Sequence, residues 1–404
     1  MRRVKSLWTL WILLSMCGHG ALAQAWEEPQ DTSTALNRPD EYAWRLFVAL
    51  SWPADPARRE ADPDKKFGEA GMAVWESWKN SNDVFLANGA DPKPWLEQPE
   101  SLIRDFQDFD PMPLQQLVRE QMATGDLGLQ PAFDPNDPQG NEVRMNKATF
   151  DFIATNGLYH LGGQEQFFYD GKRIDFPLAA KEVKAQWRPI READKPKYHW
   201  AAVRRDGQTE VWGLTAIHIT TKDLPNWFWA TFEHVDNPNL AEAEPWLLPS
   251  HDRFGCTQPP FDCNQAPAEV AGVRLTGTKW ENYRLRGTQI DFVDSTGKPT
   301  VLANSQIEQG FQLSSSCITC HATATIGPRL VDPQLNPRQV AQRLHFFVLS
   351  SRGDIEGRVG SPPPSLFDLR RLGLPNLPGE RPSRIFSQTD FVWSLFRARR
   401  KPAP

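Results

Sequence analysis

One pentapeptide near the C-terminus restricts the possible folds and functions of this chain more than any other feature. It is Cys317-Ile318-Thr319-Cys320-His321, which has the C-x-x-C-H spacing of a c-type haem attachment site. Two thiols at this spacing can each bond one vinyl group of the same porphyrin, and the adjoining imidazole can reach the iron as its proximal ligand. With five Cys and eight His among 404 residues, chance produces this pattern in about one of a thousand such chains. We therefore expect one covalent haem c, bound by Cys317, Cys320 and His321.

Two other uses of a C-x-x-C pair compete with haem attachment. A zinc site would need two more Cys or His ligands at short spacing, and the neighbouring sequence has none. A thioredoxin-like dithiol would be expected in a βαβ unit and would not need His321.

The N-terminus has the three parts of a secretory signal peptide. The positive region contains Arg2, Arg3 and Lys5, an apolar region runs from Leu7 to Cys17, and Ala21-Leu22-Ala23 is a cleavage site. The apolar run is too short to span a bilayer, and no later stretch is long and apolar enough to do so. We expect residues 1–23 to be removed and the mature chain to be located in the periplasm, where c-type haem is attached.

The remaining cysteines predict a disulfide. Cys17 leaves with the signal peptide, and Cys317 and Cys320 are assigned to haem, so Cys256 and Cys263 are left. Two thiols this close in an exported protein are expected to pair. Two buried free thiols are the alternative.

Composition indicates a globular protein that does not bind nucleic acid. Hydrophobic residues are 40% and charged residues 24% of the chain, outside the range of disordered proteins. The net charge is −5, and removal of the three basic residues of the signal peptide makes it −8. A mature chain this acidic lacks the basic excess that nucleic-acid binding requires.

Hydrophobic periodicity predicts an α+β fold in three regions. Residues 24–174 should contain helices and loops, residues 175–303 a mainly antiparallel sheet, and residues 304–404 a helical haem-binding segment packed on the rest. Helices are expected at 39–52, 72–78, 113–124, 146–156, 305–311, 337–349 and 388–400. Strands are expected at 182–187, 200–204, 209–220, 226–235 and 280–293.

The C-x-x-C-H motif does not supply the sixth ligand of the iron. Small electron-carrier cytochromes usually supply a Met downstream of the attachment site, but no Met follows Cys320. The only downstream His is His345, which shares one side of its predicted helix with Ala341 and Val348, so we predict His321 and His345 as metal ligands. An upstream His, an open iron or an upstream Met are the alternatives, the methionines being Met72, Met112, Met122 and Met145.

A second group of candidate residues lies on the predicted sheet. His218 ends the central strand, and Glu233 and His234 end the next one. Alternation along a strand places Glu233 and His234 on opposite faces, so they cannot both serve one site. If the two strands form a hairpin, His218 can neighbour one of them. A metal or acid/base site is conceivable, but a structural hydrogen-bonding role is the simpler interpretation.

The chain resembles a largely uncharacterised family of exported bacterial proteins that carry a single C-terminal C-x-x-C-H haem site. The matching stretches are Ala43-Trp44-Arg45-Leu46-Phe47-Val48-Ala49-Leu50-Ser51-Trp52-Pro53, Val74-Trp75-Glu76-Ser77-Trp78-Lys79, Glu182-Val183-Lys184-Ala185-Gln186-Trp187, Trp229-Ala230-Thr231-Phe232-Glu233-His234-Val235-Asp236-Asn237 and Leu302-Ala303-Asn304. One departure is Ser51, where the family has Asn. The resemblance implies a cytochrome and no particular reaction.

Two classes of function follow from these features. The first is a periplasmic mono-haem cytochrome that transfers electrons as the redox partner of a dehydrogenase or respiratory enzyme. The second is a haem enzyme with an open distal site and peroxidase-like or small-gas chemistry. A single haem and the lack of a convincing acid/base pair favour electron transfer, so the sequence does not establish the protein as an enzyme.

Overall fold

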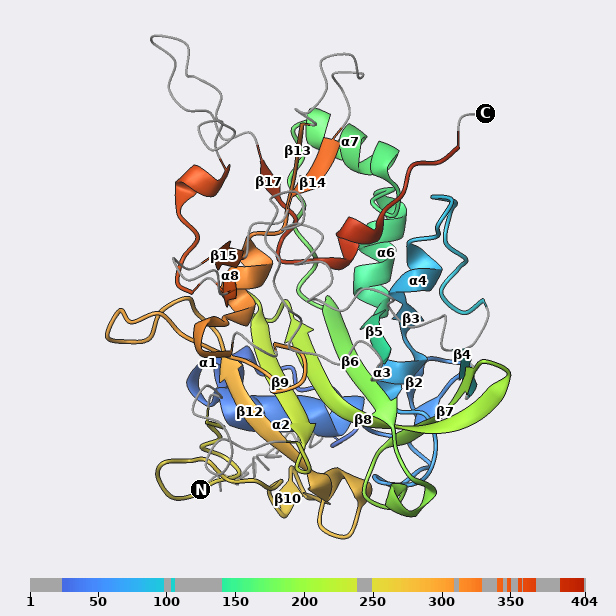
Figure 1. The fold of residues 1–404 in the computed structure, drawn as a ribbon, viewed down its shortest axis with the longest axis vertical. Helices are drawn as coiled ribbons and strands as arrows, with labels where there is room; N and C mark the ends of the chain where they lie inside the picture. The colour runs from blue at the N-terminus through green and yellow to red at the C-terminus, as the bar shows by residue number, and fades with distance from the viewer. Residues whose placement is uncertain are drawn as a thin grey trace, which may run out of the picture.

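The computed structural model describes the chain in ten stretches, and it has an α+β fold (Figure 1). The described residues are 24–97, 103–105, 140–237, 249–308, 312–328, 340–343, 347–349, 355–357, 359–367 and 386–402. The predicted signal peptide, the predicted helix 113–124 and the candidate ligand His345 lie outside these stretches. Within them, helices combine with a mainly antiparallel sheet, which confirms the predicted fold class.

An eight-stranded sheet forms the centre of the molecule. Its main path runs in the order β12-β9-β8-β6-β5-β3, with β7 paired to β8 and β4 paired to β7. All these pairs are antiparallel except β4 with β7. The strands are β3 (Lys79–Asn80), β4 (Ile103–Asp105), β5 (Gly140–Met145), β6 (Lys181–Pro189), β7 (Trp200–Arg205), β8 (Gln208–Thr221), β9 (Phe228–His234) and β12 (Tyr283–Gln289).

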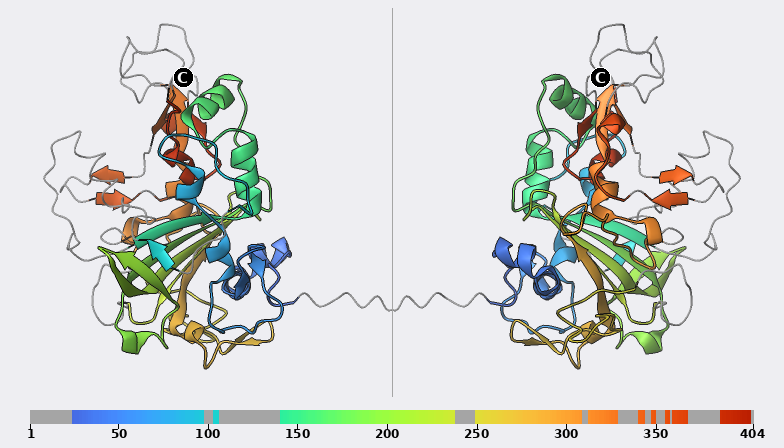
Figure 2. Two further views of the ribbon diagram at one scale, coloured as in Figure 1. Left: turned by 90° about the vertical axis from the view of Figure 1, so that its right-hand side faces the viewer. Right: turned by 90° about the vertical axis from the view of Figure 1, so that its left-hand side faces the viewer.

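One face of the sheet is apolar and is covered by the N-terminal helix α2 (Pro39–Leu50). Pro39 occupies the first helical turn, and Trp44 and Phe47 point from the helix to the sheet. Their rings lie 5.0 and 4.5 Å from that of Phe232 on β9. Figure 2 shows the blue N-terminal elements, among them α1 (Thr32–Asn37), on one side of the sheet. This large aromatic interface explains the predicted 3.6-residue period of α2.

A second apolar cluster joins α6, α7 and the C-terminal elements to the end of the sheet. Helix α6 (Lys147–Thr155) begins as predicted, because Asn146 Oδ1 accepts the Thr149 N–H at 3.1 Å. Together with α7 (Leu161–Tyr169), α6 supplies Phe150, Ile153 and Phe167, which share the cluster with Trp227, Trp229, Ile318 and Leu395. The C-terminal segment therefore packs on residues from two earlier regions.

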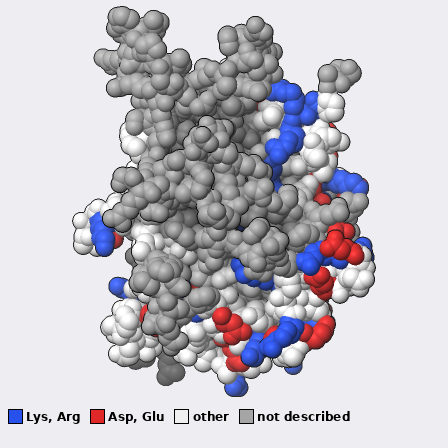
Figure 3. Space-filling model, in the orientation of Figure 1, with Lys and Arg blue, Asp and Glu red and all other residues white. Residues whose placement is uncertain are grey.

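Shorter elements complete the described part of the chain. The helices are α3 (Val74–Ser77), within the predicted 72–78, α4 (Ser81–Val84) and α8 (Cys317–Ala322). The strands are β1 (Ala54–Asp55), β2 (Glu60–Ala61), β10 (Glu269–Val270), β11 (Val273–Arg274), β13 (Thr325–Pro328), β14 (Val340–Arg343), β15 (Phe347–Leu349), β16 (Ile355–Gly357) and β17 (Ser387–Gln388). Figure 3 shows acidic and basic side chains side by side at the lower right of the face seen in Figure 1.

Three predicted C-terminal helices are wrong where the structure describes them. Residues 304–308 form turns, and the predicted helix 337–349 contains strands β14 and β15 instead, since short apolar runs fit either period. The predicted helix 388–400 starts in β17 and then turns at Asp390 and Phe391, whose φ values are +50° and +66°. Left-handed backbone ends a helix, and only a short 3-10 turn, Ser394–Arg397, follows.

Two smaller predictions have outcomes of their own. Cys256 and Cys263 form a disulfide, with Cα atoms 5.8 Å apart, as predicted. Within the described stretches no helix has the length and hydropathy to cross a bilayer.

Candidate functional site

The C-x-x-C-H motif forms helix α8, which a side chain of the sheet holds in place. Ser316 is the N-cap, and its Oγ accepts the Thr319 N–H. Gln289, the last residue of β12, accepts the Ile318 N–H at 2.9 Å and donates to Ser316 Oγ at 2.8 Å. Figure 1 shows α8 in orange above the ends of β12 and β9. The start of the motif is thus anchored to the sheet by one buried amide.

The two thiols lie one helical turn apart and are both free. Cys317 is buried with its Sγ 3.7 Å from the Leu302 carbonyl, and Cys320 is half-buried. Burial raises the pKa of both thiols, and the nearby Glu308 carboxylate adds to the effect. A reactive redox dithiol needs a lowered thiol pKa, so the environment disfavours the thioredoxin-like alternative. The spacing places both sulfurs on one side of α8, as attachment to one porphyrin requires.

His321 is held as a neutral imidazole with one nitrogen engaged. Its Nδ1 lies 2.7 Å from the carbonyl oxygen of Phe391, so Nδ1 carries the proton and Nε2 keeps its lone pair. The rings of Trp229 and Trp393 lie 4.5 and 5.8 Å from the imidazole. Burial lowers the pKa of His321 to about 3, and the charges of His218 and Lys184 act in the same direction. Metal-binding His residues usually donate their second N–H to a carbonyl or carboxylate in this way.

The sheet presents a polar face to the segment that precedes the motif. Lys184, His218 and Thr231 lie side by side on β6, β8 and β9. Asn304 Nδ2 donates to Thr231 Oγ1 at 3.0 Å, and the Asn304 N–H donates to Glu308 at 2.7 Å. Glu308 lies 3.5 Å from His218. Residues 304–308 therefore cross this face and bring a carboxylate to the buried imidazole.

Glu233 and His234 face opposite sides of β9, as the strand alternation predicts. Glu233 accepts hydrogen bonds from Arg284, on the neighbouring β12, and from Ser305. His234 stacks on Tyr198 with ring centres 3.6 Å apart, and burial lowers its pKa to about 4. The hydrogen bonds of Glu233 and the stacking of His234 indicate a structural role for both residues.

The site includes residues that no sequence signal indicated. The Phe391 carbonyl, the Gln289 amide and the Trp229 ring come together only through contacts between distant parts of the chain. Of the proposed methionine ligands, Met72 and Met145 are buried and the other two lie outside the described stretches. The described residues include no group of three or more His, Cys, Asp or Glu side chains arranged to hold a metal ion.

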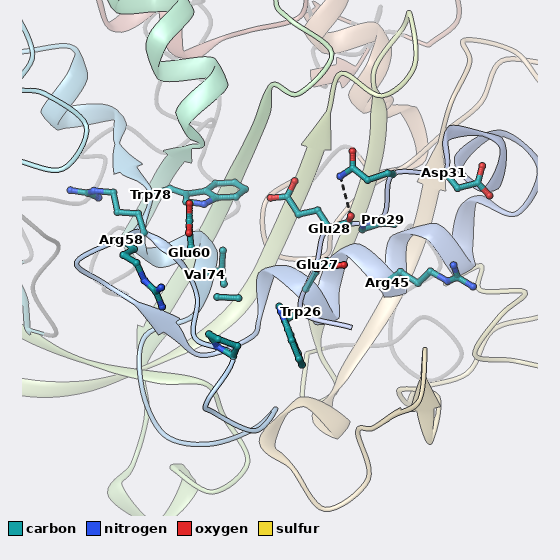
Figure 4. A pocket seen from close by; sticks show the side chains of 15 residues that line it. Trp26, Glu27, Glu28, Pro29, Asp31, Arg45, Arg58, Glu60, Val74 and Trp78 are labelled. Atoms are coloured by element: carbon teal, nitrogen blue, oxygen red, sulfur yellow. Dashed lines mark hydrogen bonds between the residues drawn. The ribbon is translucent and has the colours of Figure 1, made fainter. Parts of the chain in front are cut away.

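A cavity of about 840 Å³ opens on the N-terminal side of the molecule. Its walls come from the N-terminal arm, α2 and the β1–β2 region, and include Trp26, Glu28, Arg45, Glu60 and Trp78 (Figure 4). None of its lining residues belongs to the C-x-x-C-H motif or to the sheet face beneath it. The cavity and the motif are therefore separate features.

Comparisons with protein-family models, curated proteins and solved structures found no match for this chain. We therefore infer the function from the site itself. Its donor set, two free thiols one turn apart and a neutral imidazole with an available nitrogen, fits the requirements of covalent haem c.

Proposed function

We propose that this chain is a periplasmic mono-haem c-type cytochrome that transfers electrons to or from a dehydrogenase or respiratory enzyme. The observation that carries the proposal is the hydrogen bond between His321 Nδ1 and the Phe391 carbonyl, which leaves Nε2 as a ligand. The free thiols of Cys317 and Cys320 on the same helix support it. The acidic mature chain and the predicted signal peptide agree with an exported redox protein.

The roles of the chain's residues follow from their positions. Cys317 and Cys320 would hold the haem through thioether bonds, and His321 would bind its iron. Haem bound in this way supplies a one-electron redox centre. The Phe391 carbonyl fixes the orientation of the imidazole and increases its basicity as a ligand. Trp229 and Trp393 exclude water from the imidazole, and the dryness of such a site helps to set the potential.

Covalent attachment is the first test. The full chain, exported in a host with haem-maturation machinery, should keep its pigment through denaturation and acid–organic extraction and gain the mass of one haem. A variant with both Cys317→Ala and Cys320→Ala should lose the covalent pigment. The matched control removes the other pair, Cys256→Ala with Cys263→Ala, and should keep it. Pigment that extracts freely from the wild type would contradict the proposal.

A haem enzyme with an open distal site is the second candidate. The observation that favours it is the buried pair of His218 and Glu308 near His321, because polar distal groups are used to activate small ligands. Carbon monoxide distinguishes the two functions. An electron carrier with two strong protein ligands resists the gas when reduced, whereas an enzyme with an open iron binds it at once.

A further inference from the structure

We propose that His218 is the second protein ligand of the haem iron, opposite His321. This inference rests on the proposed function, since it needs a haem at the C-x-x-C-H motif. It assigns the sixth ligand to the sheet and not to the C-terminal segment, where the sequence suggested His345.

The first observation is an unsatisfied nitrogen on a buried side chain. The side chain of His218 is only 10% exposed, and its Nε2 makes no hydrogen bond. The nearest acidic oxygen, Glu308 Oε2, is 3.5 Å away and already accepts the Asn304 N–H at 2.7 Å. An unpaired polar atom in the interior costs roughly 1–3 kcal/mol, so its presence calls for a partner. An iron ligand bond would satisfy this nitrogen.

The second observation is the position of His218 on the sheet. In the register of β8 with β9, His218 is opposite Thr231 and Thr220 is opposite Trp229. His218 and Trp229 therefore lie on one face of neighbouring strands, two residues apart in register. The ring of Trp229 is 4.5 Å from that of His321. Trp229 thus links the sheet face that carries His218 to the imidazole of His321.

The surrounding groups favour His218 over its strand neighbour Lys184. Lys184 lies beside His218 in the register of β6 with β8 and makes no ion pair with another described residue. An ammonium has no lone pair and must lose a proton before it can bind iron, whereas a neutral imidazole is ready at pH 7. Glu308, whose carboxylate lies 3.5 Å from His218, can orient this imidazole. Metal-binding His residues usually have such a neighbouring group that orients the ring, as Glu308 can for His218.

The spectrum of the haem-loaded full chain tests this assignment. The wild type should be low-spin and six-coordinate, and should resist carbon monoxide when reduced. His218→Ala should keep the covalent haem, become high-spin and bind the gas, and added imidazole should restore the low-spin spectrum. The matched control is His251→Ala, an exposed histidine whose ring contacts Arg253, and should leave the spectrum unchanged.

A second variant keeps the test decisive if His218→Ala does not fold. His218→Met should remain six-coordinate with a higher midpoint potential, because a thioether favours the reduced iron more than an imidazole does. A high-spin wild type, or a low-spin spectrum that survives in His218→Ala without added imidazole, would overturn the assignment. Loss of the low-spin state in Lys184→Ala or His345→Ala, but not in His218→Ala, would assign the second ligand to Lys184 or His345 instead. A wild type without covalent haem would instead refute the proposed function.

Discussion

The Nδ1 of His321 lies 2.7 Å from the carbonyl oxygen of Phe391, a residue seventy positions later in the chain. The carbonyl is presented by a turn in which Asp390 and Phe391 both have positive φ. A backbone acceptor of this kind cannot be removed by changing the Phe391 side chain. The orientation of the imidazole therefore depends on whatever holds the turn.

The first prediction concerns Asp390, which anchors this turn. Its carboxylate accepts hydrogen bonds from Lys222 Nζ at 2.5 and 2.7 Å and from the Phe176 N–H at 2.7 Å. Asp390→Ala leaves a buried ammonium without its main partner, so the free energy of unfolding should fall by about 3–5 kcal/mol. The looser turn should also raise the midpoint potential of the haem-loaded protein, because the His321 ligand becomes a weaker donor.

The control for Asp390 is another partner of the same lysine. Asp175 lies 3.2 Å from Lys222 but has a side chain 79% exposed. Asp175→Ala should change the free energy of unfolding by less than about 0.5 kcal/mol and leave the potential unchanged. Urea unfolding and redox titration measure both quantities. If Asp175→Ala and Asp390→Ala changed the free energy of unfolding and the midpoint potential equally, burial of the Asp390–Lys222 pair would not be the cause of the effect.

The second prediction uses the buried charges beneath the other face of the sheet. Glu76 lies 2.6 Å from His199 Nε2 and is paired with Arg104. Burial alone would raise the pKa of Glu76, but the charges of His199 and Arg104 outweigh it and hold the pKa well below the ordinary 4.5. A lowered pKa in the folded state contributes stability above pH 4.5, and this contribution is lost as the pH falls below that value.

Glu76→Gln should therefore have an effect that depends on pH. At pH 7 it should lower the free energy of unfolding by about 3–5 kcal/mol, because the buried Arg104 loses its counter-ion. The difference from the wild type should narrow as the pH falls from 4.5. Glu192→Gln is the control, since Glu192 makes an ion pair with Lys195 but is 73% exposed. A difference that stays constant from pH 7 to pH 3 would refute the assigned charge state.

The third prediction has the opposite sign of pH dependence. Burial raises the pKa of Glu182 from 4.5 to about 7, although Ser394 Oγ donates to its carboxyl at 2.6 Å. A raised pKa in the folded state contributes stability below pH 4.5, and the contribution is lost as the pH rises through about 7. The difference in pKa corresponds to about 3 kcal/mol. Glu182→Gln should thus be more stable than the wild type at pH 8 and lose that advantage below pH 5. Chemical unfolding of both proteins at pH 8 and below pH 5 measures this difference. A wild type as stable as Glu182→Gln at pH 8 would contradict the prediction.

The parts of the fold that the sequence predicted well are those with a long, clear period. Residues 39–50 repeat apolar residues at helical spacing, and residues 181–187 alternate, so α2 and β6 were both expected. The helices predicted in the C-terminal segment are wrong because its apolar runs are short. The sequence from Val340 to Leu349 fits one helix as well as two strands. The residue types of Asp390 and Phe391 do not by themselves indicate a turn with left-handed backbone.

Part of the site could likewise be predicted from the sequence, and part could not. The spacing of Cys317, Cys320 and His321 is local and carries its own chemistry, so it is readable from the sequence. The groups around them come from β8, β9, β12 and the turn after β17, and depend on strand register. The sequence predicts His218 only as a possible neighbour of Glu233 or His234 and as one of several upstream histidines, because its relation to His321 arises from packing between separate elements.

The fourth prediction tests the link between the sheet and the motif. Gln289 is buried and satisfies both the Ile318 N–H and Ser316 Oγ. Gln289→Ala leaves the buried Ile318 N–H without its partner and removes one hydrogen bond of Ser316 Oγ, so the free energy of unfolding should fall by roughly 1–3 kcal/mol and less of the exported protein should carry haem. Gln166→Ala is the control, since Gln166 is exposed and its side chain donates a hydrogen bond to the exposed Asp170. Unchanged haem content in Gln289→Ala would show that α8 forms without the sheet.

The last prediction is that residues 305–404 do not form an autonomous cytochrome. Three residues outside this segment contact it. Gln289 of β12 accepts the Ile318 N–H, the Trp229 ring of β9 lies against His321, and Glu233 accepts a hydrogen bond from Ser305. Without them Ile318 and Cys317, which are buried in the full chain, would be exposed to water. The exported fragment should therefore be degraded or show a spectrum different from that of the full chain. A folded fragment with the full-length spectrum and the same resistance to carbon monoxide would contradict this prediction. It would also exclude His218, since the sixth ligand would then have to come from the fragment itself.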